Sequence, residues 1–152
     1  MSTSLKVLID RIALDELGDA DRAKHVINGR HHLYRCPAGK LTIGYGRNLE
    51  ANGISDVEAR ELLCNDVLQA QRDAASLVPS WFALDNVRRN VIANMAFNMG
   101  LKTLATFVHF LAAVDEQRWA DASAEMKNSL WYGETGHRAA RLAQEMLTGQ
   151  VS

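Results

Sequence analysis

The chain has 152 residues, of which 47% are hydrophobic and 23% charged, with a formal net charge of −1. These values are typical of a globular domain that is long enough to build a core, and they exclude a disordered chain. The near-neutral charge lacks the basic excess of a non-specific nucleic-acid binder, and no apolar run is long enough to span a membrane.

Residues 4–17 are predicted to form the first helix, with Ser4 as its N-cap and Gly18 at its end. One apolar stripe runs along it, formed by Leu5, Leu8, Ile9, Ile12 and Ala13. Asp10 comes too early for this N-terminus to be a signal peptide.

Glu16 falls in the last turn of that helix, where the stripe expects another apolar residue. A carboxyl half-buried there would have a raised pKa, as a general acid needs. Alternatively, the stripe has already ended and Glu16 is solvated. Periodicity alone does not distinguish the two readings.

Residues 19–27 resemble a short helix with an acidic start, and Asn28-Gly29 is a turn signal. Three histidines, at positions 25, 31 and 32, could suggest a metal. No carboxylate or further histidine stands at a supporting ligand spacing, so solvated histidines are favoured.

Residues 34–47 are predicted to form a β-hairpin, with a Pro- and Gly-containing turn followed by alternation. Five residues separate Cys36 from Thr42, so a hairpin would bring thiol and hydroxyl close enough to flank one water molecule. The alternative is an ordinary surface hairpin with a stray thiol. A disulfide between Cys36 and Cys64 is possible, but one pair is no disulfide framework.

Residues 48–53 are predicted to be a loop, and a long helix follows over 56–77, where Ser55 and Glu58 form a capping box. The rest of the chain is predicted to be helical, in segments near 82–99, 104–114, 119–126 and 135–147, with an aromatic turn at 130–133. Asn94 and Asn98 share one helix face, and their amides need partners, either structural or a sugar ligand.

Together these features resemble the phage-type lysozymes, glycoside hydrolase family 24, over nearly the whole chain apart from residues 17–29. The fragments that carry the resemblance are Thr42-Ile43-Gly44-Tyr45-Gly46-Arg47-Asn48, Leu84-Asp85-Asn86-Val87-Arg88-Arg89, Asn94-Met95-Ala96-Phe97-Asn98-Met99-Gly100, Arg118-Trp119, Ser129-Leu130-Trp131-Tyr132, Arg138-Ala139-Ala140-Arg141 and Thr148-Gly149.

The resemblance implies an α+β, mostly helical fold of two lobes. The N-terminal lobe would hold the hairpin sheet over about 15–54, and a connecting helix would span about 55–78. The helical lobe would span about 79–152, joined by helix 4–17. The implied reaction is hydrolysis of the β-1,4 bond between N-acetylmuramic acid and N-acetylglucosamine in peptidoglycan, without cofactor or metal.

The family's catalytic set is a Glu, then eight residues, an Asp or Cys, then five residues, and a Thr. Cys36 and Thr42 match its second half, but the spacing puts Ile27 where the Glu should stand. By local context the matching acid is Glu16, in Asp15-Glu16-Leu17-Gly18, with 19 residues before Cys36. If the helix ends at Gly18, Glu16 keeps its place and 19–29 bulges out. If the helix ran on, eleven further residues would carry Glu16 about 16 Å away.

The first geometry is favoured by Gly18 and the Asn28-Gly29 turn. It makes Glu16 the general acid, with Cys36 and Thr42 positioning or activating water; whether the reaction inverts or retains stays open. The resemblance adds an ion pair between Arg138 and Glu16. The other candidates for substrate-binding or supporting roles are Asn94, Asn98, Trp131, Tyr132 and Thr135.

The expected partner is the peptidoglycan glycan strand, with no nucleic acid or membrane, and the chain is expected to be a monomer. The resemblance implies a protein held in the host cytoplasm until a separate holin gives it access to the periplasmic cell wall. Three alternatives stay open: an inactive peptidoglycan- or chitin-binding module on the same fold, a helical protein-interaction domain, and a lytic transglycosylase.

Overall fold

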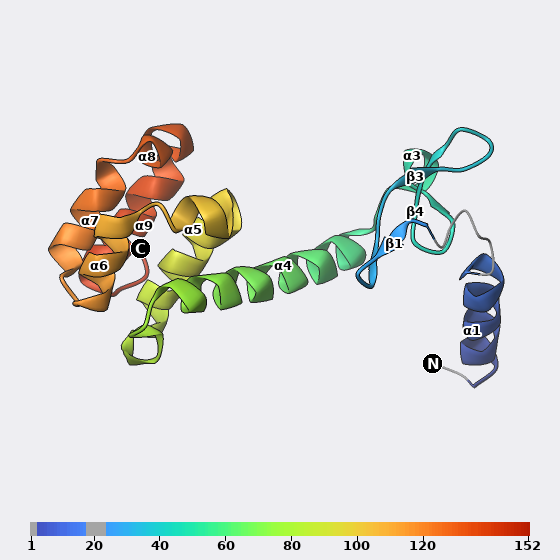
Figure 1. Cartoon of the computed structure of the whole chain (residues 1–152), viewed down its shortest axis with the longest axis horizontal. Coiled ribbons are helices and arrows are strands. Elements are labelled where there is room, and N and C mark those ends of the chain that lie inside the picture. Colours follow the sequence, from blue (N-terminus) through green and yellow to red (C-terminus); the bar gives the residue numbers. More distant parts are fainter. Residues whose placement is uncertain (1–2, 18–23) are drawn as a thin grey trace. The chain divides into compact units, whose positions relative to one another are not determined.

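The computed structural model describes residues 3–17 and 24–152 (Figure 1). The chain divides into two compact units, residues 1–59 and 60–152, and the boundary falls after Ala59. This division does not test the predicted lobes at 15–54, 55–78 and 79–152, or the joining of helix 4–17 to the last of them. Among the described helices, none is both long and apolar enough to cross a bilayer.

The first unit combines a helix with short antiparallel strands, which confirms the predicted α+β class. Its elements are α1 (Thr3–Leu17), β1 (Val26–Ile27), β2 (Arg30–His31), β3 (Tyr34–Arg35), β4 (Leu41–Ile43), β5 (Arg47–Asn48) and α3 (Leu49–Asn52). The first two strands pair with each other, and the other three form a sheet in the order β3-β4-β5. The predicted first helix is confirmed, although Ser4 lies inside it.

The β1–β2 hairpin turns at Asn28 and Gly29, whose φ angles of 51° and 72° are both positive. Positive φ at both central residues is the requirement of a type I′ turn, which matches the twist of the flanking strands. The short helix predicted over 19–27 is therefore wrong at residues 26–27, where the Asn-Gly turn imposes a strand; residues 19–23 lie outside the described ones.

The predicted hairpin over 34–47 is confirmed, with Tyr34 opposite Thr42 and Thr42 opposite Asn48. The loop predicted for 48–53 is wrong, because residues 49–52 form α3. The Asn48 side chain accepts a hydrogen bond from the Ala51 amide at 3.1 Å, and this cap starts the helix.

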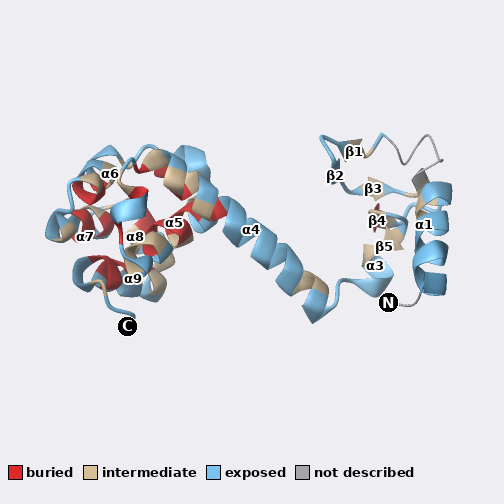
Figure 2. Cartoon of the chain, turned by 90° about the horizontal axis from the view of Figure 1, so that it is seen from below, coloured by how far each residue is buried: buried red, intermediate tan, exposed pale blue. Residues whose placement is uncertain are grey.

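Helix α4 (Asp56–Leu77) begins and ends where the sequence predicts. The Ser55 amide donates to Glu58 Oε2 at 2.7 Å and the Glu58 amide donates to Ser55 Oγ at 3.3 Å, so the capping box is present. Buried residues of this helix lie in its C-terminal half, at Ala70 and Ala74 (Figure 2).

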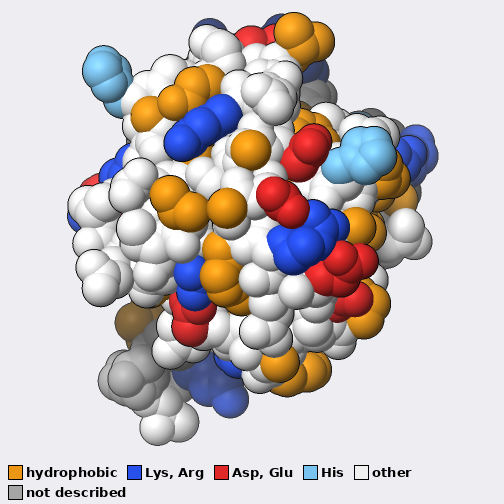
Figure 3. Space-filling model, turned by 90° about the vertical axis from the view of Figure 1, so that its left-hand side faces the viewer, with side chains coloured by type: hydrophobic (Ala, Val, Ile, Leu, Met, Phe, Trp, Pro, Cys, Tyr) orange, Lys and Arg blue, Asp and Glu red, His pale blue; other side chains and the backbone are white. Residues whose placement is uncertain are grey.

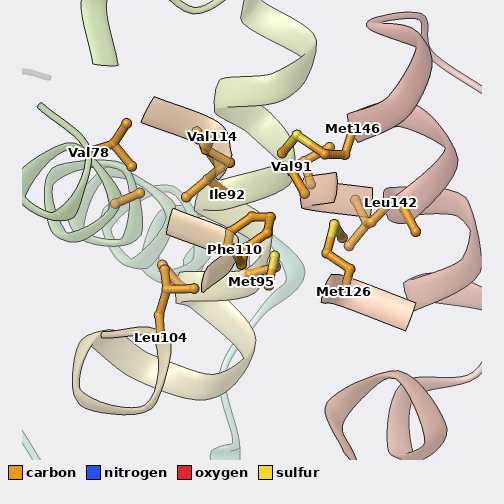
Figure 4. Close-up of a cluster of buried hydrophobic side chains, with 14 of the residues drawn as sticks. Val78, Val91, Ile92, Met95, Leu104, Phe110, Val114, Met126, Leu142 and Met146 are labelled. Carbon is orange, nitrogen blue, oxygen red and sulfur yellow. The ribbon is translucent and has the colours of Figure 1, made fainter. Parts of the chain in front are cut away.

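The second unit packs the remaining helices around one apolar core. They are η1 (Trp81–Ala83), α5 (Asn86–Leu104), α6 (Val108–Asp115), α7 (Trp119–Lys127), α8 (Leu130–Thr135) and α9 (His137–Thr148). Figure 4 shows side chains from these helices converging, among them Ile92, Met95, Phe110, Met126 and Leu142.

Capping side chains explain two predictions in this unit that are wrong. The helix predicted from 82 starts at Asn86, because Asp85 accepts the Arg88 amide at 2.9 Å. The predicted aromatic turn at 130–133 is the short helix α8, which Ser129 caps. Gly100 interrupts α5 with a φ of 79°, but the helix continues to Leu104 and does not end near 99 as predicted. The helix predicted near 104–114 accordingly begins later, at Val108.

Arg88 ties the start of α5 to the end of α9. Its Nε donates to the Met146 carbonyl at 2.9 Å and its Nη2 to the Leu147 carbonyl at 3.1 Å. Asp85 pairs with its Nη1 at 2.5 Å, and the guanidinium lies 4.1 Å from the centre of the Trp119 ring. One cation thus satisfies carbonyls at a helix C-terminus that would otherwise lack partners.

We expect Gly149→Ala to lower the free energy of unfolding of the helical unit by about 1–3 kcal/mol. Gly149 has a φ of 68°, and an added Cβ would lie 2.5 Å from Arg88 Nη1. The side chain would therefore be strained and would displace the guanidinium from its carbonyl partners. Urea unfolding followed by tryptophan fluorescence measures this, since all three tryptophans lie in residues 60–152.

Gly133→Ala is the matched control, because Gly133 lies in α8 with nothing within 4 Å of an added Cβ. Alanine favours helix by about 1 kcal/mol over glycine, so this variant should be neutral or slightly more stable. Equal losses at the two positions would contradict the role given to the Arg88 contact.

Candidate functional site

The hairpin brings Cys36 and Thr42 together, as the sequence predicts. Tyr34 stands opposite Thr42 in the ladder, and the Cys36 amide donates to the Lys40 carbonyl at 3.0 Å. Because side chains alternate along a strand, residues 34, 36 and 42 share one face of the sheet. Thr42 is only 3% exposed, and its hydroxyl donates to the same Lys40 carbonyl at 2.9 Å.

The pKa of the Cys36 thiol is lowered, chiefly by a hydrogen bond from the Lys40 backbone. The Ala38 backbone and the Thr42 side chain lower this pKa further, and partial burial opposes them. Each hydrogen bond favours the charged sulfur over the neutral thiol. Cys36 therefore loses its proton more readily than an ordinary surface thiol, and its thiolate can accept hydrogen bonds. Cys36 is not in a disulfide.

Glu16 is half-buried in the last turn of α1, and its Oε2 atom is shielded from solvent. Of the two alternatives for Glu16, half-buried or solvated, the structure shows the half-buried carboxyl. Gly18, expected to end the helix, lies outside the described residues. Ile27, at the family's acid spacing, is 52% exposed on β1 and has no proton to give. The catalytic role of Glu16 stays a prediction.

The polar candidates of the second unit form hydrogen-bonded pairs within it. Trp131 Nε1 donates to Asn98 Oδ1 at 2.7 Å, and the Thr135 hydroxyl donates to the Trp131 carbonyl at 2.5 Å. Arg138 Nε donates to Asn94 Oδ1 at 2.8 Å. Both asparagines therefore have protein partners for their carbonyl oxygens. Tyr132, also a candidate, is half-buried and packs against the core.

A pocket of about 310 Å³ lies beside the Asn94–Arg138 pair. It is lined by Leu63, Val67, Gln71, Asn90, Ala93, Asn94, Phe97 and Arg138. Sequence reasoning did not single out Gln71 or Asn90. Their spacing of four residues from Val67 and Asn94 is a helical signal that could have found them. Phe97, which lines the pocket, is 41% exposed.

The Glu16–Arg138 ion pair joins residues of two separate units and stays a prediction. Within the described ranges 3–17 and 24–152, no group of three or more His, Cys, Asp or Glu side chains could hold a metal ion.

We expect the Cys64→Ser variant, in which Cys36 is the only remaining cysteine, to react with iodoacetamide with a pH midpoint below about 8.5, the value of an ordinary cysteine. Because hydrogen bonds to sulfur stabilise the thiolate, adding Thr42→Val should move the midpoint upward. Mass spectrometry of the alkylated protein over a pH series measures both, and Cys36→Ser gives the background reaction. A midpoint at or above that of a free cysteine would contradict the environment described.

Comparison with known proteins places most of this chain in one family. The phage lysozyme family model matches residues 25–145, a range that contains Cys36, Thr42 and the polar pairs of the second unit. A probable T4-type lysozyme 1 of Dictyostelium discoideum is 41% identical over 69 residues, 45% of this chain and 41% of that protein.

Two further relatives align over longer stretches. The pre-baseplate central spike protein Gp5 of Enterobacteria phage T4 is 35% identical over 111 residues, 70% of this chain and 19% of that protein. A probable T4-type lysozyme 2 of Dictyostelium discoideum is 31% identical over 101 residues, 64% of this chain and 59% of that protein. The chain thus spans less than two thirds of each relative's length. With the family model matched over residues 25–145, the chain belongs to the phage lysozyme family.

Proposed function

We propose that this protein is a peptidoglycan hydrolase that cleaves the β-1,4 bond between N-acetylmuramic acid and N-acetylglucosamine. The observation that carries the proposal is the Cys36–Thr42 arrangement, which lies on one sheet face within the range matched by the family model. The names of two relatives, probable T4-type lysozymes, support the same class of reaction.

In this proposal Glu16 is the general acid that protonates the glycosidic oxygen. As the glycosidic bond breaks, the departing oxygen would become an alkoxide, which is a poor leaving group. Glycoside hydrolysis therefore needs a carboxylic acid that protonates this oxygen. The observation that supports this role is the half-burial of Glu16 in the last turn of α1, where its Oε2 atom is shielded from solvent.

Thr42 and Cys36 position and activate water in this proposal. The Thr42 hydroxyl lies within hydrogen-bonding distance of the Lys40 carbonyl, and its oxygen has lone pairs that can accept a hydrogen bond from water whichever group takes its proton. The Cys36 sulfur, with its lowered pKa, can accept the water's second proton. A lone pair of that water then faces away from both groups, toward the sugar.

The residues of the second unit have supporting roles in the proposal. Asn94 holds Arg138, and Asn98 holds Trp131. We assign these pairs to shaping the surface that receives the glycan rather than to the chemical step. Tyr132 and Thr135 act through the short helix α8, which carries Trp131.

A second candidate function, an inactive peptidoglycan-binding module, is favoured by one observation. The family match begins at residue 25, after Glu16, and within it Ile27 stands at the spacing of the acid. If the segment between α1 and β1 has displaced Glu16, the fold would keep its glycan surface without its proton donor.

We expect the protein to clear a suspension of chloroform-treated Gram-negative cells. The Glu16→Gln variant should clear it at least about 100-fold more slowly, because a general acid usually raises the rate by at least that factor. This substitution keeps the side-chain shape and removes the proton. Turbidity at neutral pH measures the rate. Asp15→Asn removes the neighbouring exposed carboxyl and should leave the rate near that of the parent.

Equal clearing by the parent and Glu16→Gln would rule out Glu16 as the acid. An inactive parent that still sediments with cell walls would favour the binding module.

A further inference from the structure

The segment from residue 24 to residue 49 contains no aspartate or glutamate. Its five basic residues are Lys24, Arg30, Arg35, Lys40 and Arg47, and it also holds three of the five histidines. The net charge of −1 for the whole chain conceals this local excess. By contrast, the face of the helical unit drawn in Figure 3 shows acidic and basic side chains next to each other.

Most cations of this segment have acidic partners that come after it in the chain. Arg35 and Lys40 share Glu50, at 3.4 and 3.7 Å, and Arg47 pairs with Glu58 at 2.6 Å. Arg30 is different. It is exposed on β2, and within the described part of the chain its guanidinium makes no hydrogen bond or ion pair.

The register of the β1–β2 hairpin separates an inner from an outer face. Val26 pairs with His31, and both are half-buried. Ile27 pairs with Arg30, and both are exposed. The two pairs alternate as the strand pleat requires. Ile27 and Arg30 therefore make up the outer face of the hairpin.

Ring contacts hold the inner side against the rest of the first unit. The His25 ring stacks on Tyr34 with centroids 4.8 Å apart and 12° between planes, and the His31 ring lies 5.0 Å from Tyr45. Because Tyr34 stands opposite Thr42, the hairpin is anchored beside the candidate water site. Its outer face is presented in a defined orientation.

We propose that this outer face binds the free carboxylates of peptidoglycan stem peptides, with Arg30 as the contacting residue. The inference rests on the proposed function, which supplies the polymer. A guanidinium can donate two parallel hydrogen bonds to one carboxylate, and the stem peptides of the proposed polymer carry free carboxylates. The neighbouring Ile27 offers an aliphatic surface for the C–H face of a sugar ring. Ile27 and Arg30 lie in the segment 24–49, which has no acidic residue, so no carboxylate of this segment repels the ligand's carboxylate.

Sedimentation with purified insoluble sacculi tests the proposal, in a Glu16→Gln background and over a series of salt concentrations. We expect Arg30→Gln to raise the apparent Kd about two- to five-fold at about 10 mM salt, the effect of one exposed charge pair. The difference should vanish at about 0.5 M salt, where the Debye length is only a few ångströms. Arg30→Lys should restore only part of the loss, because lysine lacks the planar fork.

Two controls separate this contact from general charge loss. Lys127→Gln removes an exposed cation of α7 and should leave Kd unchanged. Sacculi whose carboxyl groups have been amidated should bind the parent and Arg30→Gln equally. The proposal is wrong if Arg30→Gln binds intact sacculi as the parent does, or if the difference persists on amidated sacculi. It is also wrong if Arg30→Gln instead loses binding to phosphatidylglycerol vesicles.

The outcomes for binding and for hydrolysis are independent. Binding that depends on Arg30, without clearing of cells by the parent protein, would uphold this contact and reject the hydrolase. If the parent clears cells but its binding does not depend on Arg30, the hydrolase is upheld and the Arg30 contact is rejected.

Discussion

The carbonyl oxygen of Lys40 accepts hydrogen bonds from both the Cys36 amide and the Thr42 hydroxyl, at 3.0 and 2.9 Å. The backbone of the same residue also contributes most to lowering the pKa of the Cys36 thiol. The candidate water site is therefore built on backbone groups at one hairpin turn. Its geometry depends on the turn conformation, in which Gly39 has a φ of 76°, more than on any side chain at position 40. Thr42 is the only buried residue among the side chains described in the first unit, so its hydroxyl is held in place by the sheet around it.

In the helical unit, long side chains form hydrogen bonds with polar groups at the edge of the apolar core. Arg88 donates hydrogen bonds to the carbonyls at the end of α9, and the side-chain oxygens of Asn94 and Asn98 accept hydrogen bonds from Arg138 and Trp131. These contacts join residues more than 30 positions apart in the chain. They fix how α5 meets α8 and α9, which is the surface on which a glycan would lie in the proposed function. Substitutions in this network should act on stability as well as on substrate binding, so the two need separate assays.

Local signals predicted the elements whose hydrogen bonds close within a few residues. The Ser55–Glu58 box and the Asn28-Gly29 turn are both present as expected, because each is a contact between near neighbours. Predictions failed where one capping side chain decides whether a helix begins. Asn48, for example, starts α3 inside a predicted loop. The acid-free segment could have been read from the sequence, but the pairing of Arg35 and Lys40 with Glu50 could not.

The sequence by itself determined the class of fold, the hairpin with Cys36 and Thr42, and the family resemblance, since all of these depend on residue type and spacing along the chain. The tertiary structure decided which polar groups meet. It paired Asn94 with Arg138 and Asn98 with Trp131, and it left Arg30 on the outer face of the hairpin. The physical reason is that a hydrogen bond between distant residues depends on how helices pack and strands register. Packing and register are properties of the whole folded unit, and no single stretch of sequence contains them.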